Sequence, residues 1–192
     1  MVPKSITDDR CTLRALIQKD AYSREKVILS SGKESDYYID ARRVTLNPLG
    51  AYLSARLILD EVKEDKFSAI GGPTLGADPL VGAIGVLGLE AKRAFTTFII
   101  RKSPKPHGKK QQIEGPDIQS GDRVILIDDV ATTGQAFLES IAVLKKLEIT
   151  PVKAVCLVDR REGAEQALAK VGVAFVALFD IGEFHKEIKD QR

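Results

Sequence analysis

Short apolar segments alternate with amphipathic ones along most of this chain, and this alternation restricts the fold more than any other feature. Strands are expected at five apolar runs: 68–71, 94–100, 123–127, 152–158 and 173–178. Helical spacing of apolar residues predicts helices at 77–89, 134–147 and 162–171, after an earlier helix that begins at Asn47-Pro48. Strands that alternate with helices pair in parallel and are covered on both faces. The sequence therefore predicts an α/β fold with a central, mainly parallel, twisted sheet flanked by helices.

The first 45 residues do not follow this alternation. A helix is expected at about 8–20, capped by Thr7-Asp8-Asp9, and two short strands are expected at 27–30 and 37–44. A chain of 192 residues suits a single domain with a small attached subdomain. We therefore expect one domain, 1–192, with a small N-terminal subdomain at 1–45 and an α/β core at 46–180.

Composition argues against several classes of protein. Hydrophobic residues make up 44% and charged residues 29% of the chain, as in ordinary globular proteins. No window approaches the roughly 18 apolar residues of a membrane-spanning helix, and no apolar signal core lies in residues 1–10. Cys11 and Cys156 match neither a disulfide framework nor a zinc spacing. We expect a cytoplasmic protein that contacts no membrane.

Positive charge is concentrated in one segment, although the net charge is only +2. Five basic residues, with no acid among them, fall close together: Arg101, Lys102, Lys105, Lys109 and Lys110. This indicates an anionic ligand at one place, and not a surface coated for nucleic acid. The charges open a polar stretch, 101–122, that contains Pro104, Pro106, Gly108 and Gly115. Loops of this length in a compact domain are typical of active-site lids.

Two adjacent acids end the apolar run at 124–127. In a parallel α/β sheet, ligands bind beyond the carboxyl ends of the strands, where Asp128 and Asp129 would lie. The turn that follows, 131–134, offers threonine hydroxyls and helix N-terminal amides that bind anions. A ribose phosphate would place hydroxyls on the acids and phosphate on the turn. A helix cap or a magnesium site is the alternative, but the chain has neither G-x-x-x-x-G-K-[ST] nor G-x-G-x-x-G.

The stretch VILIDDVATTGQA (124–136) resembles the phosphoribosyl-pyrophosphate (PRPP) signature of the type I phosphoribosyltransferases. Four further segments resemble elements of the orotate phosphoribosyltransferases in that family: the hood strand, the pyrophosphate loop, the catalytic loop R-K-x-x-K-x-H-G, and a strand end that carries an arginine for orotate. In this order they are SGKESDYYID (31–40), GGPTLGADPL (71–80), IIRKSPKPHGKKQQIEG (99–115) and VDRREG (158–163). The resemblance implies the type I phosphoribosyltransferase fold, with 1–45 mostly forming the hood and 101–116 a mobile catalytic loop.

The resemblance also implies a reaction: PRPP and orotate would give orotidine 5′-monophosphate and pyrophosphate, in the biosynthesis of UMP. Catalytic roles would fall to Lys102, Lys105, His107, Asp128 and Asp129. PRPP would contact these five and also Arg101, Val130, Ala131, Thr132, Thr133, Gly134, Gln135 and Ala136. Orotate would contact Thr132 and Arg160, because a guanidinium binds a carboxylate in bidentate fashion.

Partners and alternatives follow from the same resemblance. Mg²⁺ would be held mainly through the substrate, with no metal ligand from the protein, and the catalytic loop would reach the neighbouring subunit of a homodimer. Leu75-Gly76 stands where many members have tyrosine and lysine, and Ser30 stands where many have lysine. The alternatives are a transferase for a purine base and a regulator that binds PRPP as a signal. The hood, the loop motif and Arg160 favour orotate.

Overall fold

A computed structural model describes residues 5–28, 34–103 and 112–185, and its centre is a six-stranded sheet. The strands are β5 (Ala69–Pro73), β6 (Thr96–Ile100), β7 (Ile113–Glu114), β8 (Arg123–Ala131), β9 (Thr150–Asp159) and β10 (Ala174–Asp180), in the spatial order β10-β9-β8-β5-β6-β7. All neighbours pair in parallel except β7, which is antiparallel to β6. The predicted α/β class and the mainly parallel sheet are confirmed.

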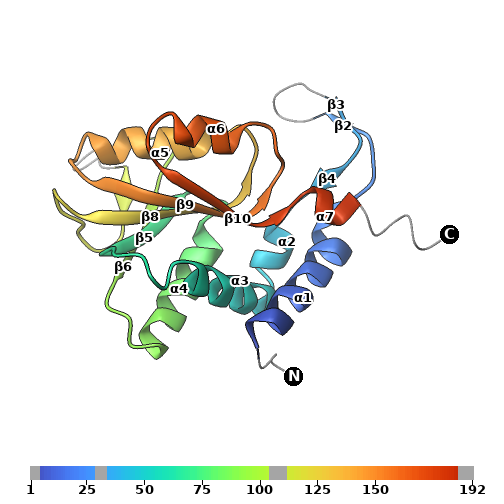
Figure 1. The fold of residues 1–192 in the computed structure, drawn as a ribbon, viewed down its shortest axis with the longest axis horizontal. Coiled ribbons are helices and arrows are strands. Elements are labelled where there is room, and N and C mark those ends of the chain that lie inside the picture. Colours follow the sequence, from blue (N-terminus) through green and yellow to red (C-terminus); the bar gives the residue numbers. More distant parts are fainter. Residues whose placement is uncertain (1–4, 29–33, 104–111, 186–192) are drawn as a thin grey trace.

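Helices cover both faces of the sheet (Figure 1). On one face lie α3 (Pro48–Glu61) and α4 (Asp78–Glu90), with α1 (Ile6–Leu16) packed on α3; on the other lie α5 (Gln135–Lys145) and α6 (Ala164–Ala169). Successive side chains of β8 point to opposite faces of the sheet, so alternate residues pack against different helix layers. Ile125 and Ile127 join the core cluster of α1, α3 and α4, whereas Val124 and Leu126 join that of α5 and α6.

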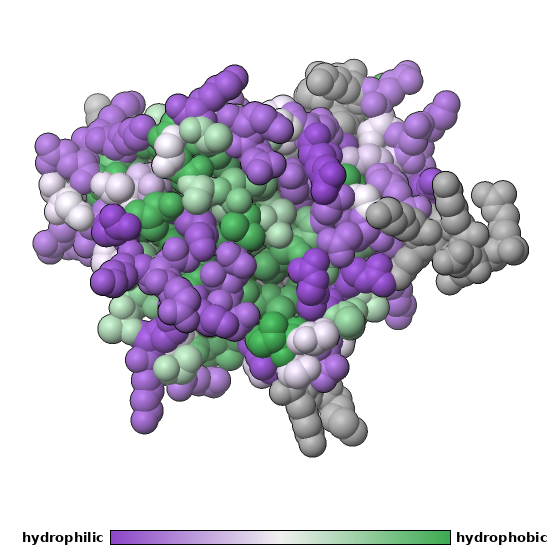
Figure 2. Space-filling view, viewed as in Figure 1, coloured by the Kyte–Doolittle hydropathy of each residue, from purple (hydrophilic) through white to green (hydrophobic). Residues whose placement is uncertain are grey.

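The edge of the sheet at β10 lies between the two helix layers. Figure 2 shows hydrophobic residues across the middle of the molecule, where β10 runs in Figure 1, between hydrophilic residues of the layers above and below. Most β10 residues are only partly buried, in agreement with an edge position. Among the described residues, no helix is long and apolar enough to cross a membrane.

The N-terminal part is built from short elements. A π-helical turn (Ile17–Ala21) continues α1, and four two-residue strands follow: β1 (Tyr22–Ser23), β2 (Val27–Ile28), β3 (Glu34–Ser35) and β4 (Tyr38–Ile39). They form two antiparallel pairs, β1 with β4 and β2 with β3. The helix α2 (Arg42–Thr45) leads to α3, and the C-terminal α7 (Gly182–His185) lies beside β4 (Figure 1).

Two expectations about this part were wrong in detail. The first helix begins after Ser5, whose hydroxyl accepts a hydrogen bond from the Asp8 amide at 3.1 Å, so Ser5 is the cap and not Thr7. The strand expected at 37–44 ends at Ile39, where Asp40 accepts hydrogen bonds from the amide and side chain of Arg42 just before α2 begins. Both differences depend on side-chain hydrogen bonds that compete with regular structure.

Candidate active site

The acid pair lies where the sheet changes its direction of winding. From β5 the chain passes through α4 to β6 on one side, and from β8 it passes through α5 to β9 on the other. Pairing of β5 with β8 ends at Gly71 and Leu126, so the two strands separate beyond these residues. Such a switch point leaves a crevice at the carboxyl ends of the strands, the usual ligand site of an open α/β sheet.

Asp128 and Asp129 belong to β8 itself, which runs to Ala131 because β9 keeps pairing with it as far as Asp159. The strand expected at 123–127 was therefore too short. The Asp129 amide donates to Asp128 Oδ1 at 2.9 Å, and the Val130 amide donates to Asp129 Oδ1 at 2.8 Å. These two bonds fix both carboxylates at the mouth of the crevice.

Negative charge at this pair is only partly compensated by neighbouring cations. Burial, and then repulsion from Asp129, raises the pKa of Asp128 well above its ordinary value, and the charge of Lys102 opposes the rise. Burial also raises the pKa of Asp129, and the charge of Arg42 opposes that rise. Two carboxylates in this position favour a ligand that brings hydroxyl donors or positive charge.

The turn after β5 lies directly against the pair. A Cβ built on Gly76 would meet Asp128 Oδ1 at 2.3 Å and Asp129 Oδ1 at 2.4 Å, so only a glycine allows this approach. The turn, 74–77, lines the cleft with Thr74, Leu75 and Gly76 and carries no charged side chain. Leu75-Gly76, the departure from the family's pattern, is therefore part of the site's geometry.

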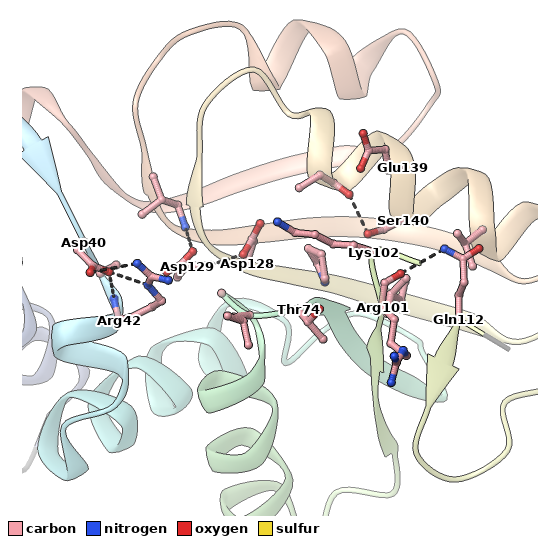
Figure 3. Close-up of a pocket in the computed structure, with 18 of the residues that line it drawn as sticks. Asp40, Arg42, Thr74, Arg101, Lys102, Gln112, Asp128, Asp129, Glu139 and Ser140 are labelled. Carbon is pink, nitrogen blue, oxygen red and sulfur yellow. Dashed lines mark hydrogen bonds and ion pairs between the residues drawn. The ribbon is translucent and has the colours of Figure 1, made fainter. Parts of the chain in front are cut away.

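The cleft has a volume of about 360 Å³ (Figure 3). Figure 3 shows the Lys102 amine directed toward Asp128 from one side, and the Arg42 guanidinium between Asp40 and Asp129 on the other. The Arg42 side chain donates to both Asp40 oxygens, at 2.8 and 3.2 Å. Further lining residues include Thr74, Leu75, Arg101, Gln112, Val130, Ala136, Glu139 and Ser140.

Arg101 lines the cleft, but its side chain pairs elsewhere. Its Nη1 lies 3.4 Å from Glu114 Oε1, and its amide donates to the Gln112 carbonyl at 2.7 Å. These contacts, with the β6–β7 pairing, bring the two described ends of the 101–116 segment together. Lys105 and His107, which the resemblance places in this loop, lie outside the described residues, as does Ser30.

The predicted phosphate turn follows β8. Gly134 has a φ of +82°, which suits glycine, and Leu138 makes the first helical bond, its amide donating to the Gly134 carbonyl at 3.0 Å. By helix geometry, the amides just before Leu138 have no carbonyl partner within α5 and can receive an anion. Thr132 is half-buried, whereas Thr133, Gln135 and Ala136 are exposed. The turn is thus open to a ligand.

Arg160 lies in a second cavity, of about 560 Å³, beside the hood. Its side chain is buried, its Nε lies 3.0 Å from Glu162 Oε1, and its guanidinium stands 4.7 Å from the ring centre of Tyr37. Its amide donates to the Ala131 carbonyl at 2.9 Å, which places it next to the phosphate turn and Thr132.

The structure adds site residues that were not predicted from the sequence. Asp40 and Arg42 reach the cleft from the hood, and Glu139 and Ser140 reach it from α5. Arg42 was missed because it was expected in a strand, and only tertiary packing brings it beside Asp129. For Glu139, spacing offered a signal: it lies one helical turn after Gln135, which donates to it at 2.9 Å.

Comparison with known proteins agrees with this site and fold. A family model for a phosphoribosyl transferase domain matches residues 47–191. The chain therefore belongs to the phosphoribosyltransferase family. Among its relatives are orotate phosphoribosyltransferases more than 30% identical to it over most of its length, and it belongs with them. One from Nostoc sp. is 37% identical over 188 residues, 96% of this chain and 91% of that protein, and one from Aquifex aeolicus is 39% identical over 155 residues, 81% and 84% of the two chains.

Solved structures give the same grouping. The orotate phosphoribosyltransferase of Mycobacterium tuberculosis in complex with PRPP has a TM-score of 0.77 and 30% identity, covering 92% of this chain and 99% of that one. The adenine phosphoribosyltransferase of Trypanosoma brucei has a TM-score of 0.64 at 18% identity, covering 91% of this chain and 82% of that one, so it shares the fold alone.

Proposed function

We propose that this protein transfers the phosphoribosyl group of PRPP to orotate, giving orotidine 5′-monophosphate and pyrophosphate in UMP biosynthesis. The bond from the anomeric carbon to the pyrophosphate oxygen breaks, with its electron pair staying on pyrophosphate, and a bond from that carbon to a ring nitrogen of orotate forms as this nitrogen loses its proton to pyrophosphate or solvent. The observation that carries the proposal is the Asp128–Asp129 pair, with Asp128 buried and Asp129 half-buried, set between an anion-binding turn and a glycine turn. Relatives at 37–39% identity that carry this activity support it.

The donor would occupy the main cleft. Its ribose hydroxyls would donate to Asp128 and Asp129, and its 5′-phosphate would accept from the amides at 132–136. As pyrophosphate leaves, positive charge develops on the ribosyl carbon and the carboxylates stabilise it. Lys102 would stabilise the leaving pyrophosphate, and Lys105 and His107 would act with it when the loop closes and excludes water.

The base would occupy the space between the phosphate turn and the hood. Arg160 adjoins Ala131 through a backbone hydrogen bond, so its guanidinium and Thr132 can face the same base. Arg160 also contacts the hood, since its Nη2 lies 3.4 Å from Ser35 Oγ. A buried guanidinium favours a base with a carboxylate, which orotate has and the common purines lack.

The donor set of the cleft fits Mg²⁺. This cation prefers oxygen ligands, keeps several waters and is commonly held through substrate phosphates. The raised pKa values of Asp128 and Asp129, caused first by burial, indicate a place where added positive charge is favourable. Mg²⁺ would neutralise pyrophosphate oxygens, and the substrate would supply most of its ligands.

We extend the proposal to a cytoplasmic homodimer. Leu46 and Leu75 are 71% and 67% exposed, and they line one cavity that adjoins the main cleft through Asp40 and Arg42. Large exposed apolar side chains beside a polar site support an interface there. A partner on this face could reach the cleft with its own loop.

The proposal is tested by following orotate absorbance on mixing protein, PRPP, Mg²⁺ and orotate, with and without orotidine monophosphate decarboxylase. Consumption that requires every component, and that the decarboxylase drives further, is the expected result. A folded protein that consumes no orotate contradicts the proposal.

A further inference from the structure

The C-terminal helix α7 reaches the hood cavity that holds Arg160. Its last residue, His185, lines this cavity together with Arg24, Glu34, Ser35, Asp36, Tyr37, Arg160 and Glu162. Figure 1 shows α7 between the end of β10 and the hood strand β4. Residues far apart in sequence therefore share one wall.

His185 contacts two hood tyrosines. Its Nδ1 lies 2.9 Å from the Tyr22 hydroxyl, and its ring meets Tyr37 edge to face, with centres 4.8 Å apart and planes at 82°. Tyr22 and Tyr37 are themselves stacked, 6.0 Å apart. Burial, and then the charge of Arg24, lowers the pKa of His185, which favours the neutral ring.

Tyr37 in turn packs against the guanidinium of Arg160. The guanidinium carbon lies 4.7 Å from the Tyr37 ring centre, within range of a cation–π contact. Tyr37 lies between two strands of two residues each, β3 and β4, and its amide and carbonyl bond the Ser35 hydroxyl. These bonds hold the main chain, whereas the ring is supported by Tyr22 on one side and by the edge of His185 on another.

The helix that presents His185 is firmly anchored. Phe184 is fully buried, with ring centres 5.9 Å from Phe179 and 6.1 Å from Tyr22. The Gly182 amide donates to Asp180 Oδ1 at 2.7 Å, and the Asp180 amide donates to Glu183 Oε1 at 3.0 Å. This anchoring gives His185 a defined place against the two tyrosines.

Arg160 has a competing partner in the cavity. Glu162 Oε1 already accepts from Arg160 Nε at 3.0 Å, so a base carboxylate must find the rest of the guanidinium correctly oriented. A long side chain gains rotational freedom when the ring beneath it moves. Orientation by Tyr37 therefore bears on base binding and not on donor binding, which takes place at the acid pair and phosphate turn.

We propose that His185 is a positioning residue for the base: it holds Tyr37, and through Tyr37 it holds Arg160 in the orientation that receives the carboxylate of orotate. This inference rests on the proposed function and adds the C-terminal helix to the base pocket. His185 itself touches no reacting atom.

Steady-state kinetics of the full chain test it, with KM for orotate and for PRPP measured separately. His185→Ala removes the ring contact and should raise KM for orotate roughly three- to tenfold, the value of one aromatic pair, with KM for PRPP unchanged. His185→Phe keeps the ring edge and should stay near the wild-type value. His185→Gln, a second variant without a ring, should behave like His185→Ala.

Ile149→Ala is the control for general destabilisation. Ile149 is buried just before β9, at the end of the sheet opposite the site, so this variant should lower Tm without changing KM for orotate. The inference about His185 would be overturned if His185→Ala changed KM for orotate and KM for PRPP equally, or if neither His185→Ala nor His185→Gln changed KM for orotate. Either result would leave the proposed function standing. Absence of orotate turnover in the wild-type protein would overturn the proposed function and this inference together.

Discussion

Gly76 lies so close to Asp128 that a methyl group at position 76 would stand 2.3 Å from Asp128 Oδ1. The same methyl would stand 2.4 Å from Asp129 Oδ1, so the substitution Gly76→Ala must displace both carboxylates or the turn. We predict a fall in kcat/KM of about a hundredfold or more, because the donor's ribose loses its aligned acceptors.

The matched control for this variant is Gly82→Ala, the same chemical change in α4. A Cβ at Gly82 meets no heavy atom within 4 Å, and alanine favours a helix, so this variant should keep its activity and gain some stability. Steady-state kinetics and thermal unfolding of both variants check the prediction. Full activity in Gly76→Ala would show that the turn does not position the acids.

Asp128→Asn should stabilise the protein at neutral pH when no ligand is bound. Burial raises the pKa of Asp128 in the folded chain above its pKa in the unfolded chain, which is near 3.8. The folded protein therefore loses stability as pH rises from the lower of these two pKa values through the higher one, because Asp128 must ionise in a buried position. Asparagine does not ionise and still accepts from the Asp129 amide. We predict a Tm higher than wild type by about 2–6 °C at pH 8, no difference near pH 4, and much lower turnover.

Thermal unfolding across this pH range measures the effect. Ser140→Ala is a comparison that changes a neutral lining residue of the same cleft, and its Tm difference from wild type should not vary with pH. If the Asp128→Asn protein had a lower Tm than wild type at pH 8, ionised Asp128 would not be a source of instability in the folded protein.

Arg42→Ala should shift the acid limb of the pH–rate profile. Burial raises the pKa of Asp129 and the Arg42 charge opposes this, so loss of that charge raises the pKa further. The limb should therefore move to higher pH in the variant. Arg43→Ala removes the adjacent charge and should leave the profile unchanged; equal shifts in both variants would contradict a specific role for Arg42.

Arg160→Lys should weaken orotate binding, whereas Arg161→Ala should not. Arg160 is 9% exposed and contacts the hood, whereas the Arg161 side chain is 72% exposed and pairs with Asp180. A lysine cannot reproduce the bidentate fork, so we predict a rise of about 10- to 100-fold in KM for orotate. Kinetics with varied orotate at saturating PRPP measure it, and a larger effect in Arg161→Ala would reverse the assignment.

The core of the fold was predictable because its signals are local. The apolar run from Val124 to Ile127 predicts a buried strand, and the two acids that follow it predict the strand's carboxyl end. Neither prediction requires information from another segment of the chain. The end of β8 was predicted too early because pairing with β9, a tertiary contact, extends the strand through polar residues. Hydrophobic periodicity carries no information about such pairing.

The parts of the site that were missed come from distant segments. Arg42 lies beside Asp129 (Figure 3) because the hood chain turns into α2 at this point, where Asp40 holds its side chain. His185 contacts Tyr37, which stacks on Arg160, because Phe184 anchors α7 in the core. Neither residue lies in a motif or in an amphipathic pattern that points to a ligand. The roles of Lys105 and His107 stay predictions from the resemblance, because they lie outside the described residues.

The most direct test of the account is base choice, read as pyrophosphate release. The protein is mixed with PRPP and Mg²⁺ and then with orotate, adenine, hypoxanthine or xanthine in separate reactions, so that one readout serves every base. We predict that, of the four bases, only orotate gives pyrophosphate release, in an amount equal to that of the nucleotide formed. This release should be lost in the variant Asp129→Asn. Release with a purine and none with orotate would contradict the assignment of Arg160 and the hood to a base that carries a carboxylate.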